Sequence, residues 1–218
     1  MNYQGRSMRV NELARKCVVF LGILDDNGAF APYGTGFIVM YGPEGSLFGY
    51  LVTAKHVLDD MLSTKRQMVA RVNDINGEAQ VGNLDAAHWE FHPTDPKCDV
   101  AVSGFTASRD TFDFRGVMLS DGIVTPEYIT EHDIGAGDQV YTTGLLVSHF
   151  GRTKNVPIVR IGNIAAMSEG SVDLGESLGH QEVYLTESRS IGGLSGSPVF
   201  LQTVPHRIGL HPIPKTPS

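Results

Sequence analysis

The chain has 218 residues, of which 41% are hydrophobic and 25 are glycine, and this is enough to bury the core of one domain or of two closely packed halves. Its formal net charge of −7, with no cluster of lysine and arginine, argues against a general nucleic-acid-binding surface. No apolar stretch is long enough to cross a membrane, so neither nucleic acid nor a membrane is an expected partner.

Short apolar and β-branched runs, separated by glycine-rich turns, predict an all-β fold. The turns Asp26-Asn27-Gly28 and Gly42-Pro43-Glu44-Gly45 separate the first three runs. A segment at about 107–134, with Pro126 and several acidic residues, predicts a crossover between two sets of strands. The first set covers 16–23, 34–41, 47–54, 67–73, 79–84 and 101–105, and the second covers 137–144, 156–165 and 182–186.

A histidine follows the third predicted strand directly. Small residues precede Lys55-His56, and the apolar and charged residues after it predict one short helical turn. A neutral imidazole at the end of a buried strand is a candidate general base near pH 7. A lone histidine of this kind is more often hydrogen-bonded within the core, and His56 taken alone leaves both interpretations open.

An aspartate opens the apolar run Val100-Ala101-Val102. The carboxylate of Asp99 needs a donor partner if the run is a buried strand. An imidazole N–H is one such donor, and the pairing would leave the other ring nitrogen free to accept a proton. A solvated or capping aspartate at the entry of a strand is the alternative.

A serine stands between glycines in Gly193-Leu194-Ser195-Gly196-Ser197-Pro198. Glycine allows a tight turn whose successive N–H groups point at a substrate oxygen. A hydrolase elbow would require Gly-x-Ser-x-Gly, followed by an acid and then a histidine. Here the last glycine is replaced by Ser197, and no aspartate or glutamate follows Ser195. The order His56, Asp99, Ser195 is instead that of the chymotrypsin-type triad.

With these residues in place, the chain resembles the trypsin-like serine peptidases of the chymotrypsin fold. The resemblance runs from about Cys17 to Leu210. It implies two Greek-key β-barrels of the six-stranded type, with the site in the cleft between them. The residues that carry it are Gly34–Val39, Leu51–Val57, Cys98–Val102 and Gly192–Pro198. The implied parts are an N-terminal extension over 1–15, a first barrel over 16–106, a crossover over 107–134, and a second barrel over 135–218 that is short at its C-terminus.

By this resemblance, Ser195 is the nucleophile, His56 the general base and Asp99 its orienting acid, while the N–H groups of Gly193 and Ser195 form the oxyanion hole. The implied reaction is peptide-bond hydrolysis through an acyl-enzyme, so a polypeptide is the expected substrate. No metal or organic cofactor is expected. Leu194 departs from the zymogen branch, which has an aspartate there to receive a new N-terminal amine, so we expect a site that needs no propeptide cleavage.

The specificity pocket is implied by resemblance to the glutamyl endopeptidase branch. There a hydroxyl residue before the serine and a later histidine bind an acidic P1 side chain, and the matching residues are Ser190 and His211. Both are suitable donors to a carboxylate. Arg189 either adds positive charge or points to solvent. Related non-specific peptidases carry a similar Ile-Gly-x-His sequence, so an acidic and a relaxed P1 preference both stay open.

Cys17 and Cys98 fall in apolar runs and are predicted to be buried free thiols. No clear secretion signal is found, and the cytoplasm is the expected location. The family continues beyond the serine with two strands and a helix, whereas this sequence reaches the proline-rich Pro212–Ser218. Three explanations stay open: a truncated form, a protein partner that completes the C-terminal region, or a non-catalytic module that binds a peptide or protein.

Overall fold

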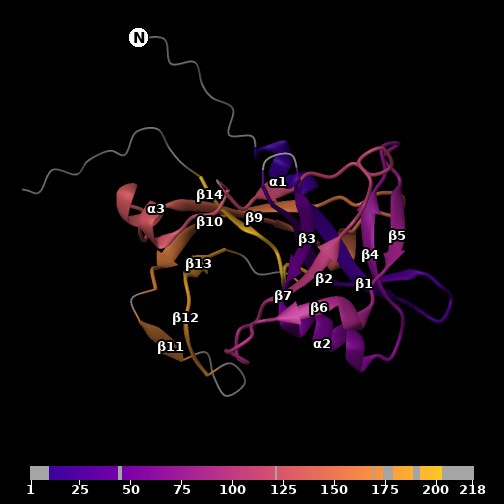
Figure 1. Ribbon diagram of the computed structural model, residues 1–218, viewed down its shortest axis with the longest axis horizontal. Coiled ribbons are helices and arrows are strands. Elements are labelled where there is room, and N and C mark those ends of the chain that lie inside the picture. The colour runs from indigo at the N-terminus through magenta and orange to yellow at the C-terminus, as the bar shows by residue number, and fades with distance from the viewer. Residues whose placement is uncertain are drawn as a thin grey trace, which may run out of the picture.

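In the computed structural model, the chain forms two β-sheets, a separate β-hairpin and a few short helices (Figure 1). The structure describes residues 10–43, 46–120, 122–168, 170–173, 179–188 and 192–202. Apart from one short parallel pair, both sheets are antiparallel, so the predicted all-β class is confirmed. None of the helices in these ranges is both long and apolar enough to span a bilayer.

The first sheet has eight strands. They are β1 (Val18–Leu24), β2 (Phe30–Tyr41), β3 (Phe48–Thr53), β4 (Met68–Asn73), β5 (Ala79–Asn83), β6 (Trp89–Phe91), β7 (Ala101–Phe105) and β8 (Val117–Met118). Their spatial order is β5-β4-β1-β2-β3-β7-β6, and β8 pairs in parallel with β2. The first set of predicted strands matches β1 to β5 and β7, while β6 and β8 are additional to that set.

Strand β1 is buried on both faces because its apolar residues are consecutive. Side chains alternate along a strand, so the odd-numbered residues enter the core of the first sheet. Val18 and Phe20 point the other way, into a second cluster that contains Leu145, from the start of the second half, and Phe200. The strand therefore lies between two cores and joins the two halves of the chain.

The second sheet has four strands. They are β9 (Gln139–Gly144), β10 (Ile158–Ala166), β13 (Leu185–Glu187) and β14 (Val199–Leu201), in the spatial order β13-β10-β9-β14. A separate hairpin consists of β11 (Ser171–Asp173) and β12 (His180–Glu182). Predicted strands 137–144 and 156–165 match β9 and β10, whereas predicted strand 182–186 is divided between the end of β12 and β13.

The helix after β3 is longer than the single turn that the sequence predicts. It runs over Lys55–Ser63, nine residues, as α2. Val57, Leu58 and Met61 are buried on one of its faces, and this helical spacing explains its length. The other helices are α1 (Glu12–Lys16), α3 (Pro126–Glu131), and the short 3₁₀ helices η1 (Ala86–His88) and η2 (Val147–His149).

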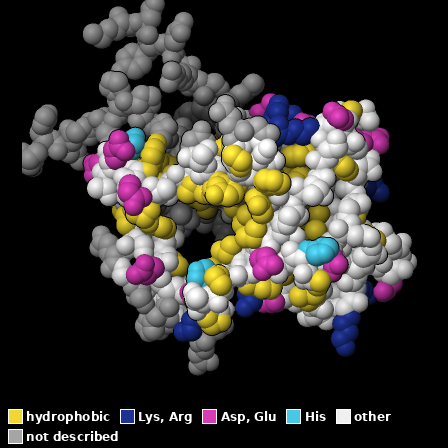
Figure 2. Space-filling view, in the orientation of Figure 1, with side chains coloured by type: hydrophobic (Ala, Val, Ile, Leu, Met, Phe, Trp, Pro, Cys, Tyr) yellow, Lys and Arg dark blue, Asp and Glu magenta, His cyan; other side chains and the backbone are white. Residues whose placement is uncertain are grey.

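The predicted closed barrels are not observed in the described part of the chain, where the sheets have eight and four strands. The end strands β5 and β6 do not pair with each other there. The second sheet borders an apolar hollow of about 440 Å³. Its lining includes Val140, Ile164, Val199 and Leu201. Figure 2 shows hydrophobic side chains exposed on one face of the molecule.

Both cysteines are free thiols, as predicted. Cys17 is buried at the end of α1. Cys98 is only partly buried, because it lies in a turn rather than in a strand. In this turn the N–H of Cys98 donates to the carbonyl of Asp95 at 3.2 Å. The prediction of a buried thiol is therefore wrong for Cys98.

Candidate functional site

His56 and Asp99 are joined by two hydrogen bonds. The ring Nδ1 of His56 lies 2.6 Å from Oδ2 of Asp99. The backbone N–H of His56 donates to Oδ1 of the same carboxylate at 2.8 Å. The second bond does not depend on the histidine tautomer, so it holds the carboxylate in place whichever ring nitrogen carries the proton. The imidazole is 50% exposed and the carboxylate 29% exposed, so the pair borders solvent rather than lying in the core.

The two residues meet because β3 pairs with β7. Thr53 at the end of β3 lies opposite Ala101 at the start of β7. The residues just outside this pair, His56 after β3 and Asp99 before β7, are therefore brought to the same edge of the sheet. Asp99 also accepts one of the first N–H groups of α2, which has no side-chain cap of its own. A negative charge at that end also suits the helix dipole.

The chemistry of the pair follows from its hydrogen bonds. When Nδ1 donates to the carboxylate, Nε2 is left as the acceptor of an incoming proton. The carboxylate also stabilises the imidazolium that forms once a proton has arrived. This arrangement is compatible with histidine acting as a general base.

The serine lies in a tight loop shaped by two glycines. Gly193 has φ +102° and Gly196 has φ +78°, values that side chains rarely allow. The turn is closed by the N–H of Ser197, which donates to the carbonyl of Leu194 at 2.9 Å. Ser195 is exposed at its tip.

This loop rests on the strand ends that carry His56. The N–H of Thr35 donates to the carbonyl of Ser195 at 2.9 Å. A Cβ placed on Gly34 would lie 2.7 Å from Val57 Cγ1 and 3.2 Å from Ser195 O, so both groups contact the same glycine. Because Val57 directly follows His56, the structure brings the backbone of Ser195 beside the first turn of α2.

Thr35 is a site residue to which the sequence alone assigns no role. Its Oγ1 donates to the carbonyl of Gly193 at 2.7 Å and accepts the N–H of Leu145 at 2.9 Å. Its own carbonyl accepts from Oγ1 of Thr53 at 2.7 Å. The threonine is fully buried, and its hydrogen bond to Gly193 ties the serine loop to β2. Its only signal in the sequence is a threonine between two glycines, at Gly34 and Gly36.

The two N–H groups predicted for the oxyanion hole belong to this loop. Among the described residues, neither the N–H of Gly193 nor that of Ser195 has a hydrogen-bond acceptor. The carbonyl of Gly193, in contrast, accepts from Thr35 Oγ1.

The residues predicted for the specificity pocket, Arg189, Ser190 and His211, lie outside the described residues. Lys55, next to His56, contacts the 91–96 segment, with Nζ donating to Pro96 O at 3.4 Å and lying 5.7 Å from the ring centroid of Phe91. In the described parts of the chain, no three His, Cys, Asp or Glu side chains converge as a metal site.

Comparison with protein-family models finds no match for this chain, and a search of curated proteins finds no significant relative. The site therefore consists of a hydrogen-bonded histidine and aspartate on the first sheet, with a glycine-shaped serine loop held against the same strand ends.

Proposed function

We propose that this protein is a serine endopeptidase related to the trypsin-like peptidases, and that it hydrolyses polypeptides through an acyl-enzyme. The observation that carries the proposal is the double hydrogen bond between His56 and Asp99 at the edge on which the Ser195 loop rests. An exposed imidazole paired with a carboxylate, close to an exposed serine in a glycine-shaped turn, suits a general base and its nucleophile.

In the proposed reaction, Ser195 Oγ attacks the carbonyl carbon of the scissile peptide bond. His56 Nε2 takes the hydroxyl proton and then gives it to the leaving amine, so the peptide C–N bond breaks and an ester to Ser195 remains. Water then gives a proton to the same nitrogen and attacks this ester. The bond from the acyl carbon to Ser195 Oγ breaks, the acid leaves, and His56 returns the proton to Ser195 Oγ. Asp99 keeps its charge throughout and stabilises the imidazolium.

The N–H groups of Gly193 and Ser195 receive the negative oxygen of each tetrahedral intermediate. Such donors act only on the charge that develops in the transition state, and they are often the largest single contribution to the rate. Since Leu194 cannot pair with a new N-terminal amine, the proposed site needs no cleavage to form.

The finer architecture is part of the proposal. The two sheets would correspond to the two Greek-key barrels of the chymotrypsin fold, over 16–106 and 135–218, joined by the 107–134 crossover and preceded by an extension over 1–15. Ser190 and His211, with Arg189, would bind an acidic P1 side chain. The protein would act in the cytoplasm, on polypeptides rather than on nucleic acid or membranes, without a metal or organic cofactor.

The second candidate function is a non-catalytic module that keeps the peptidase fold to bind a peptide or protein partner, including one that completes the C-terminal region. The apolar hollow beside β14 favours it, since Val199 is exposed and an extended peptide adds readily to such a strand.

A Ser195→Ala substitution separates these two functions. We expect the full chain to cleave an unfolded protein such as reduced casein, and Ser195→Ala to abolish cleavage while leaving peptide binding largely intact. Ser63→Ala, an exposed hydroxyl at the far end of α2, is the matched control and should cleave normally. Cleavage that survives in Ser195→Ala removes this serine as the nucleophile.

A further inference from the structure

A buried arginine connects the first sheet to the segment that leads to the serine loop. Arg71 lies in β4, in which Met68 and Val72 point into the core of the first sheet. The side chain of Arg71 points to the opposite face and is only 5% exposed. A guanidinium that gives up water to this extent must find other partners. Its burial accordingly lowers the pKa of Arg71.

The partners of Arg71 are oxygen atoms of one loop. Nη1 donates to Gly151 O and to Asn155 Oδ1, both at 3.0 Å, and Nη2 donates to Arg152 O at 2.9 Å. None of the ion pairs formed within the described residues involves this arginine. A carboxylate would have neutralised the charge, whereas carbonyl groups from one loop fix the position of that loop.

Aromatic rings complete the surroundings of the cation. The guanidinium carbon lies 5.5 Å from the ring centroid of Phe30 and 5.3 Å from that of Phe150. The two rings also meet edge to face at 5.7 Å. Because Phe150 belongs to the same loop, the stack adds a fourth contact between that loop and Arg71.

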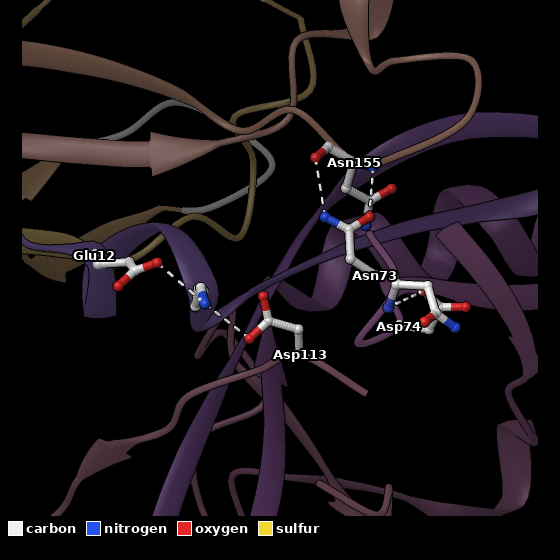
Figure 3. Close-up of polar contacts among 7 residues, drawn as sticks. Glu12, Asn73, Asp74, Asp113 and Asn155 are labelled. Atoms are coloured by element: carbon white, nitrogen blue, oxygen red, sulfur yellow. Dashed lines mark hydrogen bonds and ion pairs between the residues drawn. The ribbon is translucent and has the colours of Figure 1, made fainter. Parts of the chain in front are cut away.

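Amide side chains strengthen the same junction (Figure 3). Asn155 N donates to Asn73 Oδ1 at 2.7 Å, and Asn73 Nδ2 donates back to Asn155 O at 3.1 Å. Asn155 Nδ2 also donates to the carbonyl of Arg71 at 2.5 Å. These hydrogen bonds therefore hold the loop against β4.

The loop that Arg71 holds leads directly to the serine loop. Phe150 follows η2, and the N–H of Val147 in η2 donates to Gly192 O at 3.2 Å. A Cβ on Gly193 would lie 3.0 Å from Leu145 O and 3.0 Å from Val147 Cγ2, so this segment forms the wall against which Gly193 rests.

We propose that Arg71 is a positioning residue for the oxyanion donors: it holds the 150–155 loop, and through η2 it sets the place of the Gly192–Gly193 peptide. This inference rests on the proposed function. When Arg71 is removed, the donors shift rather than disappear. The tetrahedral intermediate should then be stabilised less, while the His56–Asp99 pair keeps its geometry.

The test compares Arg71→Met and Arg71→Lys with the unchanged full chain. We expect Arg71→Met to lower kcat about tenfold to a hundredfold with KM within about twofold, because misplacing a catalytic group by about 1 Å costs up to about a hundredfold in rate. The affinity for a peptide trifluoromethyl ketone, whose hemiketal carries the oxyanion, should fall by the same factor. The pH dependence that reports the base should not move. Lysine cannot donate as a planar fork, so its rescue should be incomplete.

Met68→Ala is the matched control, since it cuts a buried side chain from the same strand but on the face away from the loop. It should lower the melting temperature without lowering kcat. An equal loss of kcat in Met68→Ala, or an unchanged kcat in Arg71→Met, overturns the inference. If Arg71→Met does not fold, Asn155→Ala takes its place, because it removes the acceptor of one Arg71 Nη1 bond and the bond from Asn155 Nδ2 to the backbone carbonyl of Arg71.

A readout without catalysis separates this inference from the proposed function. Amide hydrogen exchange of the peptide that contains 192–197 should be faster in Arg71→Met than in the unchanged chain, and unchanged in Met68→Ala. If the unchanged chain shows no hydrolysis, the proposed function fails. If the exchange of this peptide is the same in all three proteins, the link from Arg71 to the serine loop fails.

Discussion

Among single residues, Asp99 accepts one hydrogen bond from the backbone N–H of His56 and pairs with the His56 ring, and one substitution can change the second contact alone. An asparagine keeps an oxygen for the N–H of His56 but presents an NH₂ group to Nδ1, and so imposes the tautomer in which Nε2 carries a proton. We expect Asp99→Asn to fold normally and to lower kcat by about 10⁴. Ester hydrolysis measures the rate, and calorimetry checks the fold. A kcat within tenfold of the unchanged chain would argue that the aspartate only caps α2.

The two thiols should differ in reactivity. Burial raises the pKa of Cys17 to about 12, from an ordinary value of 9.0, so at pH 8.5 this thiol stays protonated and out of reach. Cys98 is partly exposed. Iodoacetamide at pH 8.5 should therefore modify Cys98 in the folded protein, and both residues after unfolding, as read by mass spectrometry. Rapid native modification of Cys17 would contradict its burial.

The same pKa shift predicts how stability changes with pH. The folded state holds the Cys17 proton more tightly than the unfolded state does. The stability that this gives is present below pH about 9 and is lost as the pH rises toward 12. In Cys17→Ala, the free energy of unfolding should fall less steeply over that range than in the unchanged chain.

At the scale of elements, the fit of the serine loop depends on Gly196. A Cβ there would overlap Thr35 O and Thr53 Oγ1, and would lie 3.0 Å from Ala54 N. Gly28 has nearly the same φ, +77° against +78°, but has nothing within 4 Å of an added Cβ. Gly28→Ala thus measures the backbone strain alone, which is roughly 1–2 kcal/mol for a left-handed residue.

We therefore expect Gly196→Ala to be destabilised more than Gly28→Ala and to lose activity at least a hundredfold, because the loop must move off β2 and β3. Urea denaturation and ester hydrolysis measure the two effects. Equal stability and full activity in both variants would show that the serine loop does not rest on Thr35 and Thr53.

The comparison with the sequence is clearest at these elements. The predicted strand over 101–105 has the bounds of β7. His56, Asp99 and Ser195 could be selected because each sits in a local motif with its own chemistry. The length of α2 was underestimated, although Val57, Leu58 and Met61 already carried the helical spacing.

What the sequence could not predict is long-range pairing. Thr35 is hydrogen-bonded to Gly193 across a separation of 158 residues, and Arg71 to Asn155 across 84. Nothing in the sequence around either residue identifies its partner. The predicted number of strands in the first sheet is too low for the same reason. Strand β8 has only two residues, and it belongs to the sheet through a pairing with β2 that cannot be predicted from its own sequence.

At the scale of the whole molecule, β1 shares its side chains between two cores, and Arg71 joins the sheets on the side of β4. We therefore expect the halves to unfold together. Fluorescence of the single tryptophan, Trp89, reports on the first core, and hydrogen exchange of β9 reports on the second sheet. The two urea midpoints should coincide. Loss of protection in β9 at a lower urea concentration would show two independent units.

Labelling with a fluorophosphonate measures whether the His56–Asp99 pair activates Ser195. Such reagents react appreciably only with a serine that has a base and an oxyanion hole beside it. Mass spectrometry should find stoichiometric modification of Ser195 in the folded chain and none in His56→Ala. Folded protein that takes up no label, or that is labelled equally in His56→Ala, would show that the pair does not activate Ser195.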